Sequence, residues 1–256
     1  MTEIMWLGTS QQLDKITIGN VSLLSTVVMI VDSACILGVI MDSQLSLDTH
    51  AAALCRSGCY QLRQLCPVAR SLSADAAKML VHAFVSRRLD CCNALLYDVS
   101  EGLLHLVQSI QNATVWLVTG AQHRDRITPI LQQLHWLHVW QTVQFQVAVL
   151  VFQCLSGNAP TYLSDECQLI ADISMPWLRL TDMAMFAVLR SHSTFSDRCF
   201  QRLDWTTPSK IRQCDSLWEF KRLLKTHLFG DHSILWYFSS EVRLKIVLLY
   251  HNSVEK

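Results

Sequence analysis

Residues 139–155 constrain the fold more than any other segment, because they are apolar on almost every side and hold no charged residue. A helix with one polar stripe can lie at a surface, whereas a helix that is apolar all round has to be covered by other elements. Gly157 and Pro160 follow the segment and are typical of a helix end. We therefore predict a central helix over residues 139–155, packed within a bundle of other helices.

Helical periodicity recurs on both sides of this segment, with polar caps at the starts and breakers at the ends. The expected helices span residues 48–65, 73–84, 101–119, a short stretch opened by Thr128 and Pro129, and 216–229. Pro67 and Gly120 stand where the first and third of these helices should end. Residues 166–210 show weak periodicity, and we expect them to be irregular.

The spacing of apolar residues also predicts which face of each helix is buried, since positions three and four apart lie on one side. The predicted buried side chains are Ala52, Cys55, Cys59 and Leu62 on the first helix, Met79, Leu80, Ala83 and Phe84 on the second, and Leu103, Leu106, Val107, Ile110 and Leu117 on the third.

The first fifty residues are rich in Val, Ile, Ser and Thr, which favours short strands. We expect strands at residues 5–7, 21–31 and 35–40, of which those within 16–31 are expected to be buried. The uncharged stretch 16–31 is diluted by polar residues and followed by Asp32, so it falls short of the roughly 18 apolar residues that a membrane span needs. The expected fold class is mainly α, with a small N-terminal β-hairpin or sheet and a helical bundle, and no membrane partner is expected.

Composition limits the classes of partner. Hydrophobic residues make up 51% and charged residues 16% of the chain, against a usual charged share of about 25%. Either a protein partner covers some apolar surface, or the chain is poorly soluble. Lys+Arg 21 balances Asp+Glu 21, so nucleic-acid binding would depend on a local basic patch. Because the sequence shows no secretory signal, we expect an intracellular location, in the cytoplasm or nucleus.

Ten cysteines suggest disulfides or zinc, but their spacing fits neither. There is no Cys-x-x-Cys pair, and Cys55 and Cys59 lie one helical turn apart. His135 and His138 have no nearby cysteine pair to complete a tetrahedral site. The adjacent Cys91 and Cys92 beside Asp90 are not a nucleophile–base arrangement. We therefore predict no metal site and no cofactor.

Short motifs in a fixed order suggest an ancestry for most of the chain. They lie at residues 2–9, 37–42, 86–93, 108–113, 126–139, 157–165 and 220–229. In this order they resemble the region that follows the catalytic core in LINE-type (non-LTR) retrotransposon reverse transcriptases of the jockey-like group. The segment 37–42 is similar to the hairpin that grips the primer, and the later motifs are similar to the thumb and the helical region after it.

The resemblance implies four parts. Residues 1–47 would be residual palm strands with the primer-grip-like hairpin, 48–165 a thumb-like helical domain, 166–230 an irregular segment with a closing helix, and 231–256 an unmatched apolar tail. The catalytic carboxylates of the family would fall before Met1.

Polymerisation in that family uses carboxylates that hold two Mg²⁺ ions about 4 Å apart. The chain contains no adjacent Asp pair, and Asp32 and Asp42, which flank a predicted strand, are interpreted as solvated turn residues. The sequence therefore predicts a non-catalytic fragment of an RNA-directed DNA polymerase.

Several positions depart from the family pattern. Met1 stands where the family has a Lys implied to assist proton transfer, His138 replaces the usual Pro, and Trp140 stands where Arg is common. Residues 201–211 match poorly. These departures are typical of a decayed or locally rearranged relative.

A reverse-transcriptase thumb holds an RNA–DNA hybrid through backbone contacts, and basic residues are the candidates for such contacts here. The candidate residues are Arg56, Arg63 and Arg70, spaced seven apart, and a second cluster of Arg87, Arg88, Arg124 and Arg126. Two other interpretations stay open: these residues form an ordinary solvated face, or the thumb surface has become a module that binds protein or nucleic acid.

Overall fold

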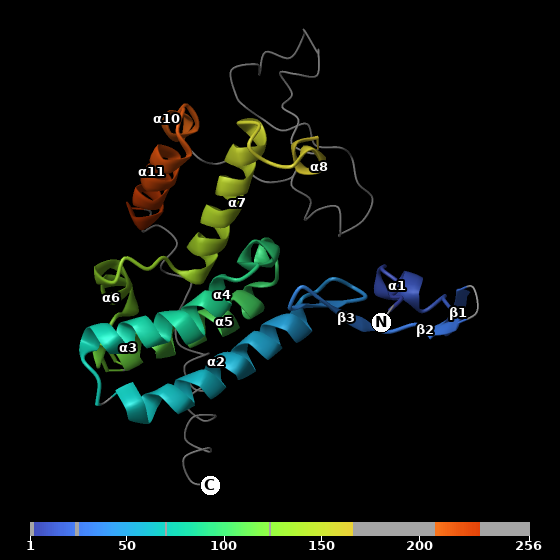
Figure 1. Ribbon diagram of the computed structural model, residues 1–256, viewed down its shortest axis with the longest axis horizontal. Helices are drawn as coiled ribbons and strands as arrows, with labels where there is room; N and C mark the ends of the chain where they lie inside the picture. Colours follow the sequence, from blue (N-terminus) through green and yellow to red (C-terminus); the bar gives the residue numbers. More distant parts are fainter. Residues whose placement is uncertain (1–2, 24–25, 70, 123, 166–207, 231–256) are drawn as a thin grey trace. The chain divides into compact units, whose positions relative to one another are not determined.

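The computed structural model describes residues 3–23, 26–69, 71–122, 124–165 and 208–230. It is mainly helical, with two small antiparallel β-hairpins near the N-terminus (Figure 1), which confirms the predicted fold class. Among these residues, no helix is both long and apolar enough to cross a membrane.

The helices and strands fall into two compact units, each considered by itself. Unit 1 comprises the described residues up to 92 and residues 99–127, and unit 2 comprises residues 93–98 and the described residues from 128 onward. The elements of unit 1 are α1 (Ser10–Leu13), β1 (Asn20–Leu23), β2 (Thr26–Met29), β3 (Ser33–Ile36), β4 (Val39–Asp42), α2 (Asp48–Ala69), α3 (Ala74–Val81), the π-helix η1 (His82–Ser86), α4 (Arg87–Asp90) and α5 (Glu101–Thr119). The elements of unit 2 are the 3₁₀-helix η2 (Asn93–Leu96), α6 (Ile127–Gln133, whose first residue belongs to unit 1), α7 (Val139–Leu155), α8 (Thr161–Ser164), α10 (Ser209–Arg212) and α11 (Leu217–Gly230).

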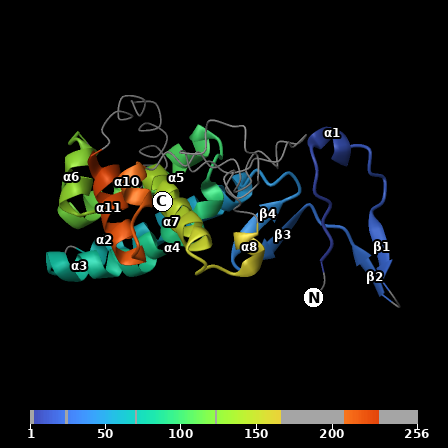
Figure 2. The ribbon, with the colours of Figure 1, turned by 90° about the horizontal axis from the view of Figure 1, so that it is seen from above.

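The strands form two separate two-stranded sheets, β1–β2 and β3–β4 (Figure 2). The prediction of a strand at 5–7 is wrong, because the first segment contributes only an isolated bridge between Ile4 and Ile30. The prediction of burial is also wrong for β1–β2, where Val27 is 62% and Met29 66% exposed. Apolar, β-branched residues favour strands, but that preference does not determine whether a second layer covers them.

The hairpin β3–β4 turns at Leu37 and Gly38, both of which have positive φ. Two consecutive residues with positive φ are typical of the tight turn that matches strand twist. This hairpin is fixed to α2 by His50, whose buried ring Nδ1 accepts a hydrogen bond from the backbone N–H of Ile40 at 3.3 Å. A neutral ring is needed for that acceptance, and burial lowers the pKa of His50.

The helix α2 packs against α5, and Gly58 lies where the two helices approach closely. A Cβ atom at Gly58 would lie 2.7 Å from Cγ2 of Ile110, so the glycine is required by close packing. The predicted end of α2 is wrong, since the helix continues past Pro67 to Ala69.

The predicted face of α2 is also displaced. The buried residues are His50, Ala51, Cys55, Gly58 and Leu62, whereas Cys59 is exposed.

One helical run passes from α3 through the π-helix η1 into α4. It begins where predicted, with the Ser73 hydroxyl accepting the backbone N–H of Ala76 at 3.3 Å. The predicted face is wrong, because Met79 is 69% and Phe84 47% exposed. The buried positions recur every four residues, at Ala77, Val81, Val85 and Leu89. The wider π turn suits that spacing, which a strict 3.6-residue period does not follow.

The helix α5 begins and ends as predicted, and Gly120 adopts the left-handed conformation at its C-terminus. Val107 and Ile110 are buried as expected. Leu103, Leu106 and Leu117 are only half-buried, because Gln108, Thr114 and Val115 complete the inner face instead.

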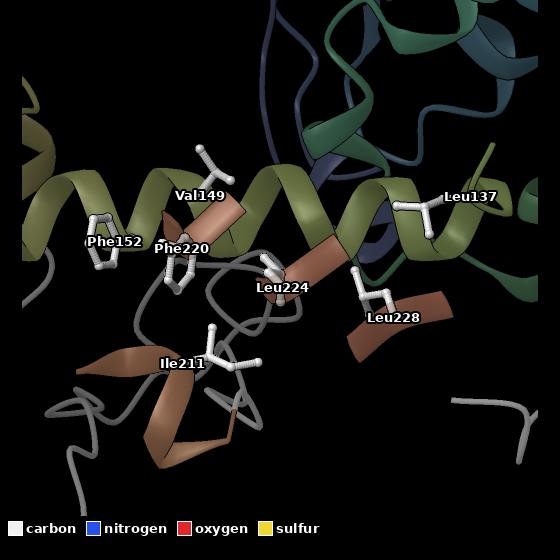
Figure 3. Close-up of a cluster of buried hydrophobic side chains, with 7 residues drawn as sticks. All are labelled: Leu137, Val149, Phe152, Ile211, Phe220, Leu224 and Leu228. Atoms are coloured by element: carbon white, nitrogen blue, oxygen red, sulfur yellow. The ribbon is translucent and has the colours of Figure 1, made fainter. Parts of the chain in front are cut away.

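In unit 2 the predicted central helix α7 is confirmed at both ends. One side of α7 packs against α11, where the rings of Phe152 and Phe220 stack with centroids 4.2 Å apart. Figure 3 shows the buried side chains of this cluster projecting between α7, α10 and α11. The cluster comprises Leu137, Val149, Phe152, Ile211, Phe220, Leu224 and Leu228.

A second cluster covers another side of α7. Val147, Val151 and Cys154 are buried there, and half-buried side chains from η2 and from the segment after α7 pack against them. The apolar helix is therefore covered on two sides, as its composition predicted. The short helix α10 was not predicted. Residues 166–207, which were expected to be irregular, lie outside the described residues.

Gln141 links the N-terminus of α7 to the C-terminus of α11. Its amide oxygen accepts the backbone N–H of His138 at 3.1 Å, and its amide nitrogen donates to the carbonyl oxygen of Leu228 at 2.6 Å. Both groups belong to helix ends, which lack partners within their own helix. One buried side chain thus satisfies a donor of α7 and an acceptor of α11.

Gly58→Ala tests the close packing of α2 and α5. Alanine gains about 1 kcal/mol of helix propensity over glycine, but the clash with Ile110 costs about 1–3 kcal/mol. We expect a net loss of unfolding free energy, measured by urea denaturation. The matched control is Gly102→Ala on α5, where no atom lies within 4 Å of the added Cβ. Equal stability of Gly58→Ala and the wild type would contradict this packing.

Candidate nucleic-acid interface

Four of the seven candidate arginines lie on two neighbouring helices of unit 1. Arg56 and Arg63 are exposed on α2, on the side away from its buried face. Arg87 and Arg88 are exposed on α4, and α2 contacts α4. The burial of Val85 and Leu89 directs the intervening arginines outward. These four residues are called the basic face below.

A hydrogen bond joins the two helices within this face. The guanidinium of Arg88 donates to the hydroxyl of Ser57, the residue next to Arg56. This contact joins the Arg88 side chain of α4 to α2, one residue from Arg56 in the sequence. The sequence did not point to Ser57. Only a predicted buried face that includes Gly58 would have indicated which side of α2 contacts α4.

Among the residues that the structure describes, no carboxylate forms an ion pair with the arginines of the basic face. Within the part of the chain that the structure describes, the one ion pair is His105–Glu101, at 3.6 Å. Arginines that are not paired within the protein can contact an external anion without first breaking an internal bridge. Asp90 lies at the end of α4 and is the nearest acidic residue in sequence.

Arg124 and Arg126 belong to a different place, the loop between α5 and α6. Both are exposed, and the turn is closed by the Asp125 carboxylate, which accepts the backbone N–H of Gln122 at 2.7 Å. No hydrogen bond or ion pair among the described residues joins these two arginines to α2 or α4. Arg70 lies outside the described residues.

Asp42 has a structural role. Its two carboxylate oxygens accept the backbone N–H groups of Ser46 at 3.0 Å and Leu47 at 2.9 Å, which closes the loop before α2. Burial alone would raise the pKa of Asp42, but the hydrogen bonds from Ser46 and Leu47 outweigh it and lower the pKa. Asp42 is therefore a half-buried residue at the end of β4 that holds the following loop, and the prediction of a solvated turn carboxylate is wrong for it.

The other candidate metal ligands do not converge. Among the described residues there is no group of three or more His, Cys, Asp or Glu side chains that could hold a metal ion. Burial raises the pKa of Cys55 to about 12 and lowers that of His138 to about 4. Cys55 is therefore a neutral core thiol at pH 7, and His138 a neutral ring at the start of α7.

No family model matches the chain, and neither does any curated protein or solved structure. The resemblance to LINE-type reverse transcriptases therefore stays a prediction from the sequence motifs.

Asp42→Asn tests the loop role. The amide keeps one acceptor oxygen, so one of the two backbone N–H groups loses its partner, at a cost of about 1–2 kcal/mol. Because the folded pKa lies below the unfolded value of about 3.9, the stabilisation is complete above that value and is lost as pH falls through the folded pKa.

We expect urea unfolding at pH 7 to show the loss, and the difference between the wild type and the variant to shrink below about pH 4. Asp32→Asn, at an exposed position, is the control. A variant as stable as the wild type at pH 7 would contradict this role of Asp42.

Proposed function

We propose that this chain is a non-catalytic relative of a LINE-type reverse transcriptase fragment, and that its basic face binds the phosphate backbone of an RNA–DNA hybrid. The observation that carries the binding proposal is the Arg88–Ser57 hydrogen bond, which unites α2 and α4 into one face. The ordered motifs support the ancestry, and the N-terminal hairpins followed by helices agree with the expected order of parts.

The electrostatics of the chain favour a weak, local mode of binding. The formal net charge is +0, so no long-range field draws in a polyanion. Three or four arginine–phosphate contacts would release about as many counterions, and the logarithm of the affinity would fall with the logarithm of salt concentration with a slope near −3. Contacts of this kind position a duplex without reading its sequence.

Polymerase activity is not part of this proposal. Phosphoryl transfer of this type depends on carboxylates that hold two metal ions, and the sequence has no adjacent Asp pair. Asp42 is already engaged by two backbone N–H groups. The proposed role of the chain is therefore binding without synthesis.

A second candidate function is a helical module that binds a protein partner. Large apolar side chains are exposed on several elements, including Trp218 and Tyr162, each 69% exposed. Contiguous exposed apolar surface marks interaction sites. A partner that covers such residues would also compensate for the low share of charged residues.

The binding proposal is tested by fluorescence anisotropy with a labelled RNA–DNA hybrid across a salt series. Arg56→Glu, Arg87→Glu and Arg88→Glu should each weaken binding and reduce the salt slope by about 1. The matched control is Arg222→Glu on α11, an exposed arginine that lies over the ring of Trp218 at 5.1 Å.

Binding that the three reversals leave unchanged would refute the basic face, while loss in the control alone would transfer the site to unit 2. If the wild-type chain bound no hybrid but captured a stable protein partner, the second candidate function would be favoured. Primer extension by the purified chain with Mg²⁺ would overturn the non-catalytic proposal.

A further inference from the structure

The adjacent Cys91 and Cys92 form an exposed pair of thiols at the end of α4. Both are free and exposed, and their sulfur atoms lie 3.8 Å apart. Cys92 has φ 57°, a left-handed conformation that a residue with a side chain rarely adopts. The helix α4 ends at Asp90, and the backbone of the next residue, Cys91, is already extended. The turn thus holds two sulfur atoms close together toward solvent.

A disulfide is a poor product for this pair. Consecutive α-carbons are about 3.8 Å apart, whereas bridged cysteines usually have α-carbons about 4.4–6.8 Å apart. A bond between Cys91 and Cys92 would therefore be strained and easily reduced. The Sγ–Sγ distance would also have to fall from 3.8 Å to about 2.0 Å.

Chelation of one thiophilic atom fits the distance better. An atom held about 2.3 Å from both sulfurs, with a sulfur–atom–sulfur angle between about 90° and 109°, needs them about 3.3–3.7 Å apart. The two sulfurs lie 3.8 Å apart, so they need to approach by only about 0.1–0.5 Å to hold such an atom. Thiolate sulfur is a soft ligand and selects soft partners. Among the described residues, no third protein ligand is grouped with the two sulfurs. The bound atom must therefore be one that needs only two ligands from the protein.

We propose that Cys91 and Cys92 form a dithiol site for trivalent arsenicals. In the reaction with a monosubstituted arsenous oxide, two S–As bonds form, both bonds between arsenic and oxygen break, and the two thiol protons leave with that oxygen as water. No atom changes oxidation state, so no oxidant is needed.

The state of the thiols agrees with this chemistry. Burial raises the pKa of Cys92, as do the hydrogen bond and charge of Cys91. The raised pKa keeps the Cys92 thiol protonated at neutral pH and slows its oxidation, which proceeds through the thiolate. The second S–As bond then forms within one molecule, and this chelate effect gives the pair its advantage over single cysteines.

The test uses the full chain and phenylarsine oxide, with intact-mass measurement after a wash in excess monothiol. The wild type should retain one arsenical that a small dithiol removes. Cys91→Ser and Cys92→Ser should each bind at least about tenfold more weakly, because only one S–As bond is left. Cys59→Ser is the control, because Cys59 is exposed beside Cys55 on α2.

Cys92→Gly is the second variant, since glycine adopts the observed φ without strain and removes only the sulfur. Its failure to retain the arsenical, with an unchanged circular dichroism spectrum, would support the site. A wild type that retains no arsenical after the monothiol wash, or single variants that retain it, would overturn the proposal. Loss in Cys59→Ser would assign the arsenical to the α2 pair and also overturn it.

Discussion

The close approach of α2 and α5 at Gly58 is the contact on which the rest of unit 1 depends. Because no side chain separates the helices there, the buried face of α2 runs through Cys55, Gly58 and Leu62. That orientation leaves Arg56 and Arg63 outward and turns Ser57 toward α4. The same helix carries His50, which receives the hairpin β3–β4. One glycine therefore sets the rotation of the helix that holds both the hairpin and the basic face.

In unit 2 the helix α7 has no polar side, so other elements have to cover it. Two apolar clusters cover α7, one built with α10 and α11 and the other with η2 and the segment after α7. Burial on two sides leaves helix-end polar groups inside, and each unpaired group would cost about 1–3 kcal/mol. Gln141 satisfies two of them at once. The apolar packing and this polar link stabilise the same pair of helices.

Sequence reasoning succeeded where one local signal decided the outcome. The ends of α5 and α7 follow from Gly120 and from the breakers after residue 155. It failed for the buried face of the α3–α4 run, because the π turn changes the period within the helix. It also failed for β1–β2, where apolar strands are exposed. Whether a strand is covered depends on elements distant in sequence, which local patterns do not report.

The candidate site shows the same division. The candidate arginines follow from charge and spacing, and in the structure Arg88 donates a hydrogen bond to Ser57, the residue next to Arg56. That partnership joins residues thirty-one positions apart, so no local pattern reports it. Arg124 and Arg126, grouped with Arg87 and Arg88 in the sequence, lie on a separate loop.

The central claim is that α2 and α4 present one basic face, with Arg88 oriented by Ser57. A double-mutant cycle with Ser57→Ala and Arg88→Gln, read out as hybrid-binding free energy at low salt, tests it most directly. If Ser57 acts through Arg88, the two effects are coupled by about 0.5 kcal/mol or more, and Ser57→Ala has no effect once Arg88 is replaced. Additive effects of the two substitutions would contradict the claim.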